Sequence, residues 1–226
     1  MKICLINNLY QPFNRGGGSE QVCANLVTDF QKLGHQVIVI STRPPGQTAP
    51  EQNNHYYLAS NFSCLETWSQ LRRLGWHLWS IFDFSISKKI KRILLHEQPD
   101  LIISHNLMGL NYSTARLAKY YPNWIHILHD IQLLHPSGLI YYQQENIINS
   151  WLAKIYQTIN KQHFKNIKLV VSPAKWLLAI HQNKKMFTVQ QLVLANPQNW
   201  LKQEIIIKEK PQIFQWLFVG QLVKHK

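Results

Sequence analysis

Short apolar runs that alternate with helical segments are the feature that most constrains the fold of this chain of 226 residues. The runs are continuous, as in Ile3–Ile6 and Val37–Ile40, and do not alternate between apolar and polar residues. Continuous runs are typical of strands that are buried on both faces of a parallel sheet. The expected strands are Ile3–Ile6, Val37–Ile40, Tyr56–Leu58, Leu101–Ser104, Trp124–Leu128, Leu169–Val171 and Leu192–Leu194.

Segments with helical periodicity separate these strands. The expected helices are Ser19–Leu33, Trp68–His96 with a break near Asp83, Leu110–Tyr120, Glu145–Phe164 and Ala174–His181. Gly34 is expected to end the first helix, Ser19 and Ser172 to cap the first and last, and Pro173 to lie early in the last. Strands joined through helices form parallel sheets covered on both faces. We therefore predict an α/β fold, a doubly wound parallel sheet over residues 1–197.

The remaining residues have a different composition. Residues 198–213 are polar and charged and are predicted to be a linker, and residues 214–226 contain one more apolar run. A strand without a following helix is not a domain, so we interpret residues 214–226 as the first strand of a truncated second domain.

The net charge of +13 indicates an anionic partner, which leaves a nucleic acid, a nucleotide or an acidic membrane open. Cys4, Cys23 and Cys64 suggest neither a disulfide framework nor a zinc site. No signal peptide and no membrane-spanning run of roughly 18 apolar residues is visible. We expect a cytoplasmic protein, and no nucleic-acid recognition motif supports a nucleic-acid partner.

Basic and aromatic residues are mixed in the segment Arg72–Arg92. A basic amphipathic helix can lie on an anionic membrane, and it can also contact nucleic-acid phosphates or form an ordinary solvated face. Peripheral contact with the inner face of a membrane is one hypothesis among these.

Polar residues follow the expected strands, at the edge of the sheet where ligands bind in folds of this class. The imidazole of His129 can donate a hydrogen bond to a sugar hydroxyl or a phosphate, and a nearby carboxylate such as that of Asp130 can orient the imidazole. Both residues are also common in solvated turns. His105 and Asn106 can form another wall of the same cleft. Adjacent residues on an extended chain point in opposite directions, so His129 and Asp130 need not act as a pair. The remaining histidines, including His126, are scattered singly, and we expect no metal site.

Gly16–Gly18, followed by Ser19 and Glu20, lies between the first strand and the first helix. Glycines allow close approach of a ligand, and free N–H groups at the start of a helix attract anions. The loop matches neither the dinucleotide fingerprint nor a P-loop, and a merely flexible loop remains the alternative.

The order of these landmarks resembles glycosyltransferase family 4, whose members are retaining enzymes of GT-B architecture. The matching segments are the opening strand from Met1 to Asn7 with Pro12, the glycine loop Gly16–Glu20, the passage Leu33–Val37, the strand Pro99–His105, the pair His129–Asp130, the strand Val170–Ala174, the turn Ala195–Pro197 and the segment Phe218–Lys226. Each motif is short, and the resemblance rests on their order and spacing.

The resemblance implies a Rossmann-like half of a GT-B fold that binds the acceptor. A second domain would hold most of a UDP- or GDP-linked sugar donor, and the transfer would need no bound metal. The resemblance also implies His129 and Asp130 as catalytic residues. Gly16, Gly17, Gly18 and Lys226 are implied as the donor-phosphate site. The implied acceptor side of the cleft consists of Asn8, Glu20, His105 and Asn106.

Two features depart from the family pattern. Gln221 stands where the family usually has Arg, and Gln supplies no positive charge for a diphosphate. The donor domain would begin where the sequence stops, so we expect little transferase activity from the chain alone and restoration of activity by a separate donor domain.

The expected function is sugar transfer to a polysaccharide or lipid-linked acceptor. The alternative is a non-catalytic sugar- or membrane-binding module derived from this fold.

Overall fold

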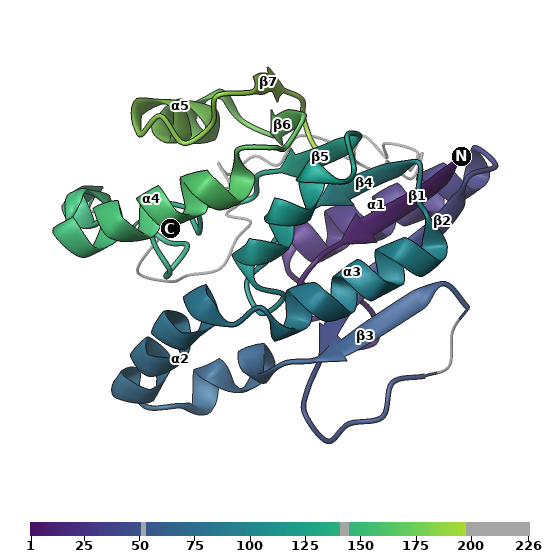
Figure 1. Cartoon of the computed structure of the whole chain (residues 1–226), viewed down its shortest axis with the longest axis horizontal. Coiled ribbons are helices and arrows are strands. Elements are labelled where there is room, and N and C mark those ends of the chain that lie inside the picture. Colours follow the sequence, from purple (N-terminus) through teal and green to yellow (C-terminus); the bar gives the residue numbers. More distant parts are fainter. Residues whose placement is uncertain (51–52, 141–144, 198–226) are drawn as a thin grey trace, which may run out of the picture.

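The computed structural model of the chain describes residues 1–50, 53–140 and 145–197, and in these ranges the strands form one parallel sheet (Figure 1). The strand order is β3-β2-β1-β4-β5-β6-β7. The strands are β1 Lys2–Ile6, β2 Gln36–Arg43, β3 His55–Ala59, β4 Leu101–Ser104, β5 Trp124–Ile127, β6 Leu169–Ser172 and β7 Gln190–Val193. The predicted doubly wound parallel sheet is confirmed.

The sheet reverses its order beside its first strand. From β1 the chain adds β2 and β3 on one side and then returns to add β4 on the other. Ligands bind in folds of this type beyond the carboxyl ends of the strands at such a switch point. The residues after β1 and β4 therefore lie at the edge where a ligand is expected.

Helices connect most of the strands, in the order that the sequence predicts, and β2 is followed directly by β3 among the described elements. The α-helices are α1 Gly18–Lys32, α2 Gln70–Phe82, α3 Ser85–Glu97, α4 Trp151–Phe164 and α5 Lys175–Asn183. The 3₁₀ helices of the described residues are η1 Asn61–Thr67, η2 Tyr112–Lys119 and η3 Glu145–Asn149.

Successive residues of the central strands serve two separate cores. Cys4 and Ile6 of β1 join the larger cluster, which α3, η2, α4 and α5 cover. Ile3 and Leu5 face the other way, into a smaller cluster that includes Cys23 of α1. Figure 1 accordingly shows α3 in front of the strands and α1 behind them. Burial on both faces explains why these strands are continuously apolar.

The structure corrects several predicted helix boundaries. The expected helix Leu110–Tyr120 is the 3₁₀ segment η2, and Glu145–Phe164 divides at Ser150 into η3 and α4. The break expected near Asp83 is confirmed, because α2 ends at Phe82 and α3 starts at Ser85. Gly34 follows α1 with a φ of +78°, as the predicted helix stop requires.

Both predicted serine caps are wrong. The residue that precedes α1 is Gly17, so Ser19 lies inside the first turn, and no side chain caps this end. Ser172 ends β6, its hydroxyl donates to the carbonyl oxygen of Ala174 at 2.9 Å, and α5 starts only at Lys175, after Pro173. The predicted linker 198–213 and strand 214–226 lie outside the described residues.

Candidate functional site

The turns that follow β1 and β4 are joined by hydrogen bonds at the switch point. Parallel pairing places Ile6 of β1 level with Ser104 of β4, so the residues after both strands emerge together. The N–H of Asn8 donates to the carbonyl oxygen of Asn106 at 2.8 Å, and the N–H of Asn106 donates to Oδ1 of Asn7 at 3.3 Å. This bonding brings Asn8 and Asn106, two predicted cleft residues, side by side.

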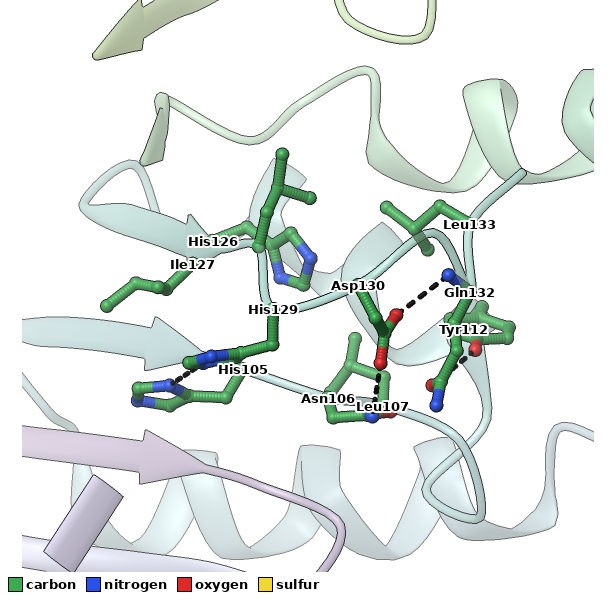
Figure 2. A pocket seen from close by; sticks show the side chains of 11 residues that line it. His105, Asn106, Leu107, Tyr112, His126, Ile127, His129, Asp130, Gln132 and Leu133 are labelled. Carbon is green, nitrogen blue, oxygen red and sulfur yellow. Dashed lines mark hydrogen bonds between the residues drawn. The ribbon is translucent and has the colours of Figure 1, made fainter. Parts of the chain in front are cut away.

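His105 and His129 form a direct pair beyond β4 and β5. Nδ1 of His105 and Nε2 of His129 lie 2.9 Å apart, and the two rings are nearly parallel, with planes 20° apart (Figure 2). One proton lies between these nitrogens, so one ring donates and the other accepts. Nε2 of His105 is buried and has no hydrogen-bond partner among the described residues. His105 thus supports the His129 ring through the hydrogen bond between them and through the stacking of the two rings.

Asp130 points away from this histidine pair, toward Asn106 and Gln132 (Figure 2). Its Oδ1 accepts the backbone N–H of Gln132 at 2.7 Å, and its Oδ2 accepts Nδ2–H of Asn106 at 3.4 Å. Oε1 of Gln132 in turn accepts the hydroxyl proton of Tyr112 at 3.2 Å. As the alternation along an extended chain predicts, His129 and Asp130 have different partners.

A small pocket collects most of these side chains. Its lining is His105, Asn106, Leu107, Tyr112, His126, Ile127, Leu128, His129, Asp130, Gln132 and Leu133. Four predicted site residues thus meet in one place, with both predicted catalytic residues among them. His126 and Gln132 were not predicted.

His126 belongs to a buried hydrogen-bond chain under the pocket. The indole N–H of Trp124 donates to Oγ of Ser104 at 2.8 Å, and that oxygen lies 2.9 Å from Nδ1 of His126. The ring of Phe164 packs edge-on against His126, with centroids 4.8 Å apart. A polar residue inside the strand β5 was the sequence signal for this arrangement, because it interrupts an otherwise apolar run.

Burial sets the charge of the site. Burial lowers the pKa of His129 to about 4 and that of His126 to about 3, and it holds the pKa of His105 well below 6.5. Burial raises the pKa of Asp130 to about 6, against the opposing effect of the N–H bond from Gln132. At neutral pH the histidines are uncharged and can donate to and accept from hydroxyl groups, while Asp130 is close to its titration range.

The glycine loop forms a separate group that does not contribute to the pocket lining. Glu20 is buried, and its Oε2 accepts the backbone N–H of Arg15 at 2.6 Å. A Cβ on Gly17 would lie 3.0 Å from Oε1 of Glu20, so the carboxylate folds back over the loop. The guanidinium of Arg15 then reaches η1, where it donates to the carbonyl oxygen of Ser63 at 2.7 Å and contacts Glu66.

Glu20 thus supports the loop in which Gly16–Gly18 lie, and its predicted cleft role remains untested. Lys226, the predicted phosphate-binding lysine, lies outside the described residues. In the ranges that the structure describes, no group of three or more His, Cys, Asp or Glu side chains is placed to hold a metal ion. No helix in these ranges is long and apolar enough to cross a membrane.

Comparison with known proteins assigns the chain to a family. The family model for Glycosyltransferase Family 4 matches residues 16–187. The chain belongs to glycosyltransferase family 4. Its sheet is the Rossmann-like half of the GT-B architecture, as the motifs predict.

Two other proteins are similar to this chain. An uncharacterized 42.6 kDa protein in the cps region of Klebsiella pneumoniae is 26% identical, and the match covers 87% of this chain and 56% of that protein. Sucrose-phosphate synthase from Thermosynechococcus elongatus shares the fold with a TM-score of 0.51 at 11% identity, over 86% of this chain and 47% of the other. The chain therefore spans about half the length of each of these two proteins.

Proposed function

We propose that the chain is the acceptor-side domain of a glycosyltransferase that moves a sugar from a UDP- or GDP-linked donor to a polysaccharide or lipid-linked acceptor. The observation that carries this proposal is the pocket at the switch point, where His105, Asn106, His129 and Asp130 meet in a chain of this family. Uncharged imidazoles and an amide offer both donors and acceptors, which matches the hydroxyl groups of a sugar.

The proposed division of labour follows from the geometry and charge of the pocket. His129, neutral and held by His105, hydrogen-bonds a hydroxyl of the transferred sugar. Asp130 orients the neighbouring Asn106 and exchanges a proton near its raised pKa of about 6. We further propose that the sugar is transferred with retention of configuration. Cations of a second domain would stabilise the leaving diphosphate.

Both walls of a cleft must contribute contacts to its transition state. Because the chain spans about half of its relatives, we propose that transfer requires a complementary donor domain, in the same or a separate polypeptide. Lys226 would bind the donor phosphate from that side. The cytoplasmic side of a membrane is the proposed location, where nucleotide sugars and a lipid-linked acceptor can meet.

Calorimetric titration with UDP, GDP and their common sugar conjugates tests the proposal. The 226-residue chain is titrated alone and after mixing with a donor domain made from a relative. His129→Ala should weaken nucleotide-sugar binding in the mixture about tenfold, the effect of one lost hydrogen bond in a closed site. His96→Ala is the matched control, because the His96 side chain is 80% exposed and lies outside the pocket.

Binding and sugar transfer that appear only in the mixture, and that His129→Ala weakens, support the proposal. Transfer by the unmixed chain would refute the need for a donor domain. Equal affinity of the His129→Ala and His96→Ala proteins would remove His129 from the site.

A non-catalytic sugar- or membrane-binding module is a second candidate, and Gln221 is the observation that favours it. Gln221 replaces the Arg expected at a diphosphate site and carries no positive charge. When glycan and lipid ligands are added to these titrations, this candidate predicts that they bind without any sugar transfer, whichever donor domain is present.

Membrane contact through Arg72–Arg92 is proposed as part of either function. Leu71 and Trp79 of α2 are 82% and 71% exposed, and the Arg72 guanidinium lies 3.8 Å from the centre of the Trp68 ring. An exposed apolar and basic helix of this kind suits an anionic interface. Arg72→Gln with Arg73→Gln should lower sedimentation with anionic vesicles, and unchanged sedimentation would rule this contact out.

A further inference from the structure

Helix α4 exposes an apolar stripe that no described residue covers. Trp151, Leu152 and Ile155 are 68%, 57% and 51% exposed, and Ile159 is half-buried beside them. Their spacing places them along one side of the helix. Large apolar side chains grouped in this way on a surface indicate a binding face.

The opposite side of α4 is firmly attached to the domain. Tyr156 donates its hydroxyl proton to the carbonyl oxygen of Gln132 at 2.9 Å. Nε2–H of Gln157 donates to the carbonyl oxygen of Leu134 at 3.0 Å, and Nδ2–H of Asn160 donates to that of Leu133 at the same distance. These bonds fix which side of the helix faces inward, so the apolar stripe is an outer surface of the folded domain.

A row of lysines accompanies the stripe. Lys154 and Lys161 lie about two turns apart on α4, next to the apolar residues, and Lys165 follows the helix. The sequence from Asn146 to Pro197 contains no acidic residue. Its seven lysines are Lys154, Lys161, Lys165, Lys168, Lys175, Lys184 and Lys185. The charged side chains in this stretch of the sequence are therefore all basic.

We propose that this α4 face (Trp151, Leu152, Ile155 and Ile159 with Lys154 and Lys161) docks on an anionic lipid bilayer. The apolar stripe would enter the boundary between headgroups and acyl chains, while the lysines extend to the headgroups. Charge complementarity selects this partner, because a layer of anionic headgroups can neutralise a row of lysines in a stretch of sequence that has no acidic residue. The α4 face is distinct from Arg72–Arg92, and its docking does not depend on sugar transfer.

Sedimentation of the full chain with sucrose-loaded vesicles tests this docking. Vesicles of phosphatidylcholine alone are compared with vesicles that also contain phosphatidylglycerol. Two α4 variants, Trp151→Ser/Ile155→Ser and Lys154→Gln/Lys161→Gln, are compared with two matched controls, Leu33→Ser/Leu95→Ser and Lys32→Gln/Lys119→Gln. The control residues are exposed and lie outside α4, and circular dichroism verifies that each protein is folded.

Each α4 variant should lose at least about tenfold in partitioning to anionic vesicles, while each control changes less than about twofold. Higher salt should weaken binding of the unchanged chain, since the lysines act through screened charges. Equal sedimentation with both vesicle types, or equal losses in α4 variants and controls, would overturn the proposal. Vesicle binding that Trp151→Ser/Ile155→Ser leaves unchanged, with a lower molar mass in solution, would instead show contact with a second copy.

Discussion

Gly109 shows how one residue ties the loop after β4 to the segment η1. Its φ of +86° lies in the left-handed region, and a Cβ there would come within 2.6 Å of the Phe62 Cβ and 3.2 Å of the Ser60 Oγ. The Ser60 hydroxyl also donates to the Gly109 carbonyl oxygen at 2.9 Å. Backbone conformation and close packing therefore demand glycine at the same position.

We predict that Gly109→Ala lowers the free energy of unfolding by at least about 2 kcal/mol, because strain and overpacking add. Gly34→Ala is the matched control, since Gly34 has a φ of +78° but no atom within 4 Å of the added Cβ. It should cost only about 1 kcal/mol of backbone strain. Urea unfolding measures both proteins, and equal losses would show that contact with Phe62 contributes nothing.

At the scale of the element, the start of α4 differs from the start of α2. Both helices follow a serine at the N-cap. The Ser150 hydroxyl accepts the N–H of Ala153 at 3.2 Å, whereas Ser69 makes no side-chain hydrogen bond to its helix. One cap thus satisfies a backbone donor that the helix itself leaves free, and the other does not.

Ser150→Ala is accordingly predicted to destabilise the protein by about 1 kcal/mol, the usual effect of a lost cap. Ser69→Ala should change stability by less than about 0.5 kcal/mol. The two midpoints of urea unfolding provide the measurement. A larger loss for Ser69→Ala would mean that the two helix starts do not make these contacts in solution.

At the scale of the whole molecule, buried neutral histidines govern the response to acid. The pKa is about 4 for His129 and His163 and about 3 for His126, against 6.5 for a free histidine. As pH falls from about 6.5 to about 4, the unfolded chain binds these protons first, so stability decreases. Asp130 acts in the opposite sense between about 4 and about 6, because its folded pKa is raised.

We predict that the stability of the chain falls on acidification through this window, as urea unfolding at about pH 7 and about pH 5 would measure. Asp130→Asn removes the opposing group and the cost of a buried charge at neutral pH. The variant should gain stability at about pH 7 and lose more than the unchanged chain on acidification. A shallower pH dependence in Asp130→Asn would contradict the raised pKa of Asp130.

The main elements could be predicted because their signals are local. Continuous apolar runs indicated strands buried on both faces, and Cys4 and Ile6 do face one core while Ile3 and Leu5 face the other. The helix caps could not be predicted in this way. Serine is common at helix starts, but whether Ser172 ends a strand or begins a helix depends on its pairing with Val193 in β7.

The site was predictable only in part. His105, Asn106, His129 and Asp130 follow strands, and in a parallel sheet such residues share one edge, so their convergence follows from the pattern. His126 lies inside a strand, and only the hydrogen bonds of Ser104 and the packing of Phe164 place it beneath the pocket. Glu20 stands beside a glycine loop in the sequence but folds back onto Arg15.

Periodicity and motif order are properties of neighbouring residues, so they were enough to predict the fold class, the family and the edge of the sheet where polar residues gather. Which of those residues are in contact, which side of α4 faces outward and which groups lose their charge became clear only from the folded structure. These properties depend on burial and on contacts between distant segments, such as the 2.9 Å approach of His105 to His129, and no local pattern specifies them.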